Sequence, residues 1–213
     1  MKALNLFVIA AALLASLSAT AQSPIYLFEE YADGTVILKD HSVVKTQLNL
    51  DIFHDKFLYK DGDQVMEMTD LSNIAAVYIG ERTFIPQGRF LYEVLRLDDE
   101  NNLLVKWHQK KIPMGRKAGY DQIAHGQNTQ ALPTGYYSPS PTQTDESVVM
   151  RTVSENKYGI LSQGSVRSFA DRRSFLKLFP DHKMQIEAFI AENHVSFSRL
   201  EDVVSLTKYA LDL

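Results

Sequence analysis

Short runs of apolar and β-branched residues alternate with clusters of turn residues from Ile25 to Trp107. This spacing is typical of an antiparallel meander, because each run is long enough for one strand and each polar break for one turn. The clearest break is Asp61-Gly62, where the glycine accepts the positive φ that a tight hairpin turn needs. The pattern predicts about eight strands, including residues 35–38, 43–50, 57–60, 65–68, 74–79, 90–97 and 103–107.

The segment 109–147 departs from this pattern. It contains 39 residues and four of the seven prolines of the chain, with little periodicity. Connections of this length without structure of their own are uncommon in compact domains, and they often carry binding functions. We therefore expect a long loop here and look to it for function. Beyond it, residues 148–153 and 158–161 predict another hairpin, with its turn at 154–157.

From Ser168 onward the apolar residues recur at helical spacing. The sequence Ser168 to Asp171 resembles a capping box for a first helix, which Pro180 interrupts. A second helix is expected over residues 181–193, because Asn193 tolerates the left-handed geometry of a helix end. The sequence Ser198 to Glu201 resembles another capping box and predicts the start of a third helix.

Strands at the front of the chain and helices at the back predict an α+β fold rather than a parallel α/β fold. We expect an antiparallel β-meander, either a curled sheet or a sandwich-like pair of layers, in residues 22–167. A C-terminal segment of three helices, residues 168–213, is expected to pack on the sheet, because each helix has only one apolar face.

Residues 1–21 are interpreted as a cleaved signal peptide. Lys2 precedes ten unbroken apolar residues, Leu6 to Ala15, and Ala19-Thr20-Ala21 follows. A cation, a short apolar run and small residues two apart are the features of a secretory leader, and the run is too short to span a bilayer. Cleavage would leave Gln22 as the first residue. We expect a periplasmic or secreted protein that does not span the membrane.

The composition narrows the function further. There is no cysteine, so neither a disulfide nor the lipid-bearing cysteine of a bacterial lipoprotein is available. Because Lys2 is the one basic residue of the leader, the remaining chain has 21 basic against 26 acidic residues, a net charge of −5. An acidic excess argues against nucleic-acid binding. The chain also lacks the glycine-rich phosphate-binding motifs, so we predict no cofactor.

Three features together suggest a family. They are the leader ending Ala19-Thr20-Ala21-Gln22, a strand running from Val77 to Phe84, and an ending from Leu178-Phe179-Pro180-Asp181 through Tyr209. In these features the chain resembles small exported proteins of unknown function that are widespread in Bacteroidota. The resemblance implies an exported location, and it implies no activity and no site.

The most distinctive charge feature lies between residues 106 and 117, where five cations occur in twelve residues without an acid. Such a cluster suits an anionic glycan, a lipid head group or an acidic envelope protein, with Trp107 offering a stacking face. The alternative is a strand end with solvated lysines and Trp107 as a core anchor. Three loop tyrosines among asparagine and glutamine residues also suit sugar recognition. The candidate ligand-binding residues are Trp107, Lys110, Lys111, Arg116, Lys117, Tyr120, Tyr136 and Tyr137.

The six histidines do not occur at the spacing of a metal site, and we interpret them as structural or surface residues. Without a catalytic signature, the sequence predicts a non-catalytic binding or interaction protein of the cell envelope. Two alternatives stay open. One is an exported hydrolase acting on glycan or peptide, whose paired carboxylates a sequence cannot locate. The other is a structural envelope subunit held through an exposed sheet edge.

Overall fold

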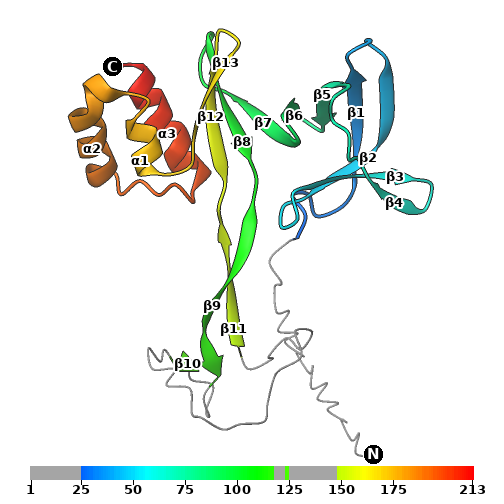
Figure 1. Ribbon diagram of the computed structural model, residues 1–213, viewed down its shortest axis with the longest axis horizontal. Helices are drawn as coiled ribbons and strands as arrows, with labels where there is room; N and C mark the ends of the chain where they lie inside the picture. Colours follow the sequence, from blue (N-terminus) through cyan, green and yellow to red (C-terminus); the bar gives the residue numbers. More distant parts are fainter. Residues whose placement is uncertain (1–24, 118–122, 125–147) are drawn as a thin grey trace, which may run out of the picture.

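The computed structural model describes residues 25–117, 123–124 and 148–213, and the side chains of these residues up to 114 and from 149 onward. Antiparallel sheet makes up most of it, with helices near the C-terminus, so the fold is broadly α+β as predicted (Figure 1). The main sheet is open, with strand order β13-β12-β8-β7-β6-β5-β1-β2-β3-β4. Its strands are β1 Ala32–Leu38, β2 Val43–Asp51, β3 Lys56–Asp61, β4 Gln64–Glu67, β5 Ile74–Ile79, β6 Arg82–Gln87, β7 Phe90–Arg96, β8 Asn101–Lys106, β12 Lys157–Ser162 and β13 Ser165–Phe169.

Most of the meander follows the sequence prediction. Strands β1 to β4 pair in order in one direction, β5 to β8 pair in order in the other, and the β1–β5 pair joins the two runs. The hairpin predicted at Asp61-Gly62 is confirmed: Asp61 lies opposite Gln64, and Gly62 has φ of +59°. The strand predicted from Val77 to Phe84 is wrong as one strand. Gly80, with φ of +58°, turns the chain there and separates β5 from β6.

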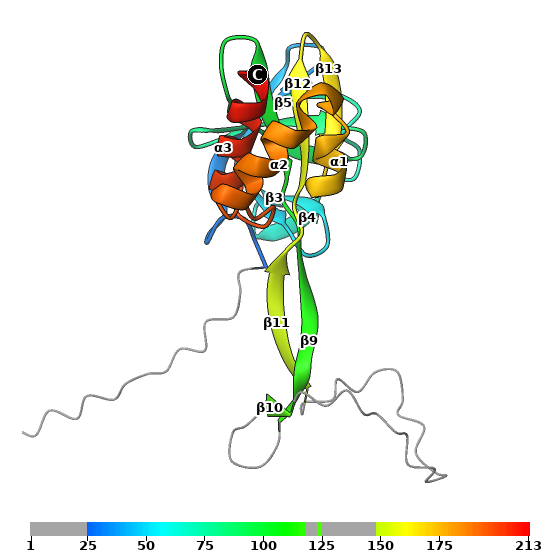
Figure 2. The ribbon, with the colours of Figure 1, turned by 90° about the vertical axis from the view of Figure 1, so that its left-hand side faces the viewer.

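A second sheet forms a narrow arm that projects from the body of the molecule (Figure 2). It consists of β9 Gln109–Lys117, β11 Val148–Ser154 and the two-residue β10 Ile123–Ala124. Strand β9 continues from β8, and β11 leads into β12, so the two paired segments of the body extend into the arm.

The structure of the arm contradicts two predictions made from the sequence. Residues 109–117 are a strand rather than part of a loop, while residues 118–122 and 125–147 of the predicted loop lie outside the described residues. The hairpin predicted between 148–153 and 158–161 is also wrong, because β11 pairs with β9 whereas β12 pairs with β8 and β13. The backbone N–H of Glu155 donates to His108 O at 2.8 Å, which keeps the two segments together where the arm leaves the body.

The helical part is smaller than predicted. It consists of α1 Arg172–Leu176, the 3₁₀ turn η1 Pro180–His182, α2 Lys183–Glu192 and α3 Leu200–Leu211. Ser168 lies in β13, so the capping box predicted there is wrong. The box lies three residues later, where Asp171 Oδ1 accepts from the backbone N–H of Ser174 at 2.7 Å and the Ser174 hydroxyl accepts from the Asp171 N–H at 3.0 Å. Helix α2 ends at the predicted residue, with Asn193 as its C-cap. The left-handed geometry expected of Asn193 is wrong, because the residue with positive φ is the next one, His194, at +48°.

Helix α3 begins without the capping box predicted at Ser198 and Glu201. Its N-cap is Arg199, whose side chain makes no capping hydrogen bond. Asp202 in the first turn instead accepts from the backbone N–H of Ser196 at 2.8 Å and from Arg199 Nε at 2.8 Å. The entry into α3 is therefore fixed by a carboxylate inside the helix rather than by a residue before it.

Two hydrophobic clusters hold the body together. In one, the helices pack on β8, β12 and β13, with Phe175 and Ile186 fully buried against Tyr158. The other lies along β7, β6, β5, β1, β2 and β3, around Val77 and Phe84. Trp107 packs against both clusters at the end of β8. Within the described residues, no helix combines the length and apolar character required to cross a membrane.

Candidate functional site

A cleft of about 350 Å³ opens where four segments of the chain converge. They are the turn between β2 and β3, residues 67–71 after β4, residues 89–91 at the β6–β7 turn, and residues 106–107 at the end of β8. Its lining is mixed. The apolar side chains are Leu50, Ile52, Phe57, Met68, Leu71, Phe90, Leu91 and Trp107, and the polar ones are Asp51, His54, Asp55, Lys56, Glu67, Thr69, Arg89 and Lys106.

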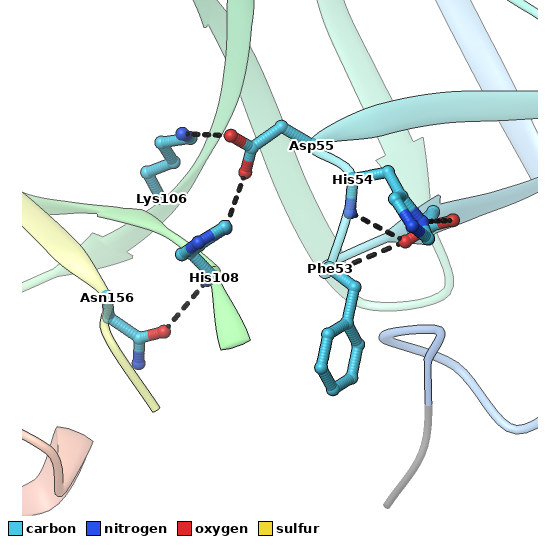
Figure 3. A network of polar contacts seen from close by, with 7 residues as sticks. Phe53, His54, Asp55, Lys106, His108 and Asn156 are labelled. Carbon is cyan, nitrogen blue, oxygen red and sulfur yellow. Dashed lines mark hydrogen bonds and ion pairs between the residues drawn. The ribbon is translucent and has the colours of Figure 1, made fainter. Parts of the chain in front are cut away.

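Asp55 connects the β2–β3 turn to the end of β8. Its Oδ2 lies 2.7 Å from Lys106 Nζ, and its Oδ1 lies 2.9 Å from His108 Nδ1. Figure 3 shows the Lys106 ammonium and the His108 ring meeting different oxygens of this carboxylate. Asp55 has φ of +58°, a left-handed conformation that Asp and Asn tolerate better than most residues. The turn thus places a carboxylate between two basic groups that lie more than fifty residues further along the chain, Lys106 at the end of β8 and His108 just before β9.

Lys106 is a buried cation, with 7% of its side chain exposed. Besides its ion pair, its Nζ lies 3.7 Å from the centroid of the Phe90 ring, which gives it a second favourable contact. Burial raises the pKa of the neighbouring Tyr92 hydroxyl, and the negative charge of Asp55 raises that pKa further. The backbone N–H of His108 donates to Asn156 Oδ1 at 3.0 Å, so the network extends from the cleft into the base of the arm (Figure 3).

The other two carboxylates of the cleft are also paired. Asp51 Oδ1 accepts from the backbone N–H groups of Phe53 and His54 at 3.0 and 2.9 Å, and Asp51 Oδ2 lies 2.8 Å from His54 Nδ1. Glu67 lies 2.7 Å from Lys56, and the hydrogen bond between them raises the pKa of Lys56. His54 and Asp55 are adjacent in the turn, but His54 contacts Asp51 whereas Asp55 contacts Lys106 and His108.

Arg89 differs from the other charged groups of the cleft. It is exposed, and its guanidinium carbon lies 4.9 Å from the centroid of the Phe90 ring. In the part of the chain that the structure describes, Arg89 forms no ion pair. It is thus an exposed cation of the cleft lining that forms no ion pair with a described residue.

Trp107 is anchored at the cleft by a buried carboxylate. Its Nε1–H donates to Glu93 Oε2 at 2.6 Å, and Glu93 also accepts from Arg82 Nε and Nη2, both at 2.6 Å. The Arg82 guanidinium carbon lies 5.4 Å from the Trp107 ring centroid and 5.0 Å from that of Phe28. These contacts fit the interpretation of Trp107 as a core anchor, and the same residue lines the cleft.

Of the other candidate residues, Lys110 and Lys111 are described and are not part of the cleft lining. Lys110 pairs across the arm with Glu155 at 2.5 Å, and this hydrogen bond lowers the pKa of Glu155. Lys111 Nζ lies 5.9 Å from the ring centroid of Phe53, in the turn that lines the cleft. The backbone of Arg116 and Lys117 lies in β9. The side chains of these two residues, and all of Tyr120, Tyr136 and Tyr137, lie outside the described residues.

Sequence reasoning missed most of the residues that form the cleft. Asp55 and Arg89 carry no motif, and the partners of Asp55 are set by tertiary structure rather than by spacing. Only Asp51 and His54, three residues apart and followed by a strand, offered a local signal of a turn. Among the side chains that are described, no group of three or more is placed to hold a metal ion.

Comparison of the chain with protein-family models, with curated proteins and with solved structures gives no match. The resemblance to exported proteins of Bacteroidota thus stays a prediction, and function has to be inferred from the geometry of the cleft.

Proposed function

We propose that this chain is an exported, non-catalytic binding protein of the cell envelope whose cleft takes an anionic saccharide. The observation that supports this is how the charged groups of the cleft are paired. Its three carboxylates already have partners, whereas Arg89 has no ion pair with a described residue. An uncompensated cation at the rim of a concave site attracts an anionic group and forms charge-assisted hydrogen bonds with it.

The lining supports a saccharide as the ligand. The rings of Phe90 and Trp107 contribute apolar surface to the cleft lining, while His54 and Thr69 supply groups that hydrogen-bond hydroxyls. A volume of about 350 Å³ is at the lower end of the range for small-ligand sites, so a single acidic sugar unit fits better than a longer segment. The remaining units of a polymer would extend beyond the rim.

A non-catalytic role is supported by how the acidic groups are held. Asp51, Asp55 and Glu67 each lie within 2.8 Å of a basic side chain, so each carboxylate has a partner within the chain before any ligand arrives. General acid–base catalysis needs a carboxylate or imidazole that reaches the substrate. His108 bonds to Asp55, but its side chain is not part of the cleft lining.

The base of the arm extends the proposed contact surface. Lys111 lies against Phe53, and the backbone of β9 carries the chain from there towards Arg116 and Lys117. We expect these cations to attract a polyanion to the cleft from a distance, with a strong dependence on ionic strength.

Binding of uronic-acid oligosaccharides, measured by calorimetry against neutral oligosaccharides of equal length, tests the proposal. We expect the acidic ligand to bind and Arg89→Gln to raise its Kd about tenfold or more, because a hydrogen bond to a charged group is lost. Arg96→Gln is the matched control, since it removes the same charge from the other end of β7. Equal affinity for the neutral ligand, or an equal effect of both variants, would overturn the proposal.

One observation favours the hydrolase as a second candidate, namely the pairing of His108 Nδ1 with Asp55 Oδ1. Such a pair orients an imidazole in many hydrolytic sites. Incubation of the same oligosaccharides with the protein, followed by chromatography of the products, distinguishes the two. Cleavage that His108→Gln abolishes would establish the hydrolase and refute the non-catalytic role.

Export is testable by itself. The proposed leader predicts a protein in the periplasm or medium, with Gln22 as the N-terminal residue of the processed chain. Fractionation of expressing cells and N-terminal sequencing would check both. An uncleaved chain in the cytosol would remove the cell envelope from the proposal without touching the ligand.

A further inference from the structure

A second concave surface lies on the helical part of the molecule, between α1 and α2. Figure 2 shows these two helices side by side on the face turned towards the viewer, away from the arm. The groove between them has a volume of about 610 Å³, and it is lined by Arg172, Arg173, Leu176, Lys177, Lys183 and Glu187, together with Pro180. Four of these residues are basic and one is acidic.

Basic residues outnumber acidic ones in the lining of this groove, although Arg173 and Lys177 also interact electrostatically with Asp171. Arg172 pairs with Glu187, at a distance of 3.6 Å between Nη2 and Oε1. Arg173, Lys177 and Lys183 are exposed and form no ion pair with any residue that the structure describes. In a chain whose overall charge is negative, three unpaired cations around one concavity mark a surface that attracts anionic groups.

The groove also has an apolar component. Leu176 and Pro180 contribute to its lining between the cationic side chains. Leu176 is 8% exposed and belongs to the core of the helical half, so this part of the groove is rigid. A ligand that fits it therefore combines an apolar group at the centre with negative charges on either side.

We propose that this groove is a docking site for an acidic, extended peptide segment of a partner protein, with an apolar side chain over Leu176 and carboxylates on the surrounding cations. Arginine favours this occupant, because its planar guanidinium binds carboxylates through two parallel hydrogen bonds. A concave groove suits a peptide chain better than a flat bilayer. Met184, which follows the lining residue Lys183 in the chain, is 82% exposed, but one exposed apolar side chain is little to insert among lipids.

The groove shares no residue with the cleft at Arg89, so this inference is independent of the proposed function. The two sites also differ in how many of their cations form ion pairs within the chain. In the cleft most cations are paired within the chain, whereas in the groove most are free of such pairs.

Fluorescence anisotropy with a labelled peptide of glutamates around a central pair of leucines tests the proposal on the full chain. We expect binding that weakens with salt, and little binding of a peptide with every glutamate replaced by glutamine. The double variant Arg173→Gln/Lys177→Gln should raise the Kd about tenfold, because two exposed charge contacts are lost. The matched control is Lys39→Gln/Lys208→Gln, two exposed lysines outside the groove, which should change the Kd by less than about twofold.

Three results would overturn the proposal. An equal loss of affinity in both double variants would show attraction to net charge rather than to the groove. Equal binding of the glutamine peptide would show that the cations are not used. Binding to anionic phosphatidylglycerol vesicles that Arg173→Gln/Lys177→Gln abolishes, without peptide binding, would assign the surface to a membrane instead. Arg89→Gln should leave peptide affinity unchanged, which separates this test from that of the cleft.

Discussion

Replacement of Asp55 by Asn tests whether the ion pair with Lys106 holds the cleft together. Asn has the same shape and tolerates the left-handed backbone at this position, so the change removes the charge with little backbone strain. It leaves the Lys106 ammonium, 7% exposed, without its anionic partner. Removing one partner of a buried pair costs about 3–5 kcal/mol, and we expect about 3 kcal/mol because Asp55 itself is 24% exposed.

A double-mutant cycle isolates the pair. Lys106→Met removes the ammonium while keeping an unbranched chain against Phe90. The double variant should be less destabilised than the sum of the two single changes, with a coupling free energy of about 2 kcal/mol. The matched control is the exposed pair of Lys110 and Glu155, whose side chains are 47% and 51% exposed. Its coupling should be about 0.5 kcal/mol or less.

Urea unfolding, followed by the fluorescence of Trp107, the single tryptophan of the chain, gives the free energies of unfolding. Circular dichroism of the same samples checks that both probes report one transition. A coupling free energy for Asp55 and Lys106 as small as that of the control pair would refute the interpretation that this ion pair holds the cleft together.

Three further predictions concern packing and pH. Phe175→Ala removes a side chain with 0% exposure from the helical core, and should lower the free energy of unfolding by about 3–5 kcal/mol; a loss below about 1 kcal/mol in urea would contradict this. Gly34→Ala would place a Cβ 2.5 Å from Leu48 Cδ1 and 2.9 Å from the backbone oxygen of Tyr78, and should cost about 1–3 kcal/mol; an unchanged Tm would contradict this by showing that both neighbours can move aside. The backbone hydrogen bond from Ser196 holds the pKa of Asp202 below its ordinary value of 3.8. A carboxylate whose pKa is lower in the folded state stabilises the fold at pH values above the unfolded pKa, and this stabilisation is lost as the pH falls through the folded pKa. The difference in free energy of unfolding between the wild type and Asp202→Asn should therefore shrink below pH 3.8. A difference that persists in stronger acid would contradict this prediction.

Local signals predicted the fold where pairing is local. The β3–β4 hairpin follows from Gly62 and two short alternating runs, because a tight turn fixes its own register. Strand β9 escaped prediction because its pairing partner is supplied by distant β11, and because Pro113 and Gly115 are typical of loops. Pro113 lies opposite Met150 of β11, while the pairing of β9 with β10 involves only Arg116 and Lys117. A strand with one neighbour at this point tolerates a proline, which has no N–H to donate.

The remaining errors arose from ambiguous short motifs. Ser168 and Asp171 have the spacing of a capping box. In the structure Ser168 belongs to β13 and lies opposite Gly159 of β12, while Asp171 forms its capping box with Ser174. Strand β13 was missed for the same reason. The turn before it, where Gln163 and Gly164 both have positive φ, is the signal that could have revealed it.

The candidate site could be predicted only in part. Trp107 was recognised from its setting among lysines, and it lines the cleft. The bonds from Asp55 to Lys106 and His108 join positions that are 51 and 53 residues apart, so no spacing in the sequence indicates them. A sequence does not show which charged residues form ion pairs in the folded protein. Lys106 forms one with Asp55, whereas Arg89 forms none with a described residue.

The most direct test of the cleft as the ligand site is a titration of the isotopically labelled protein with a uronic-acid oligosaccharide, followed by the backbone amide resonances. We expect shifts that saturate and that map to residues 51–57, 67–71, 89–91 and 106–107, the segments that line the cleft. Saturating shifts confined to other parts of the chain, or no shifts at ligand concentrations in the millimolar range, would contradict the assignment of this cleft.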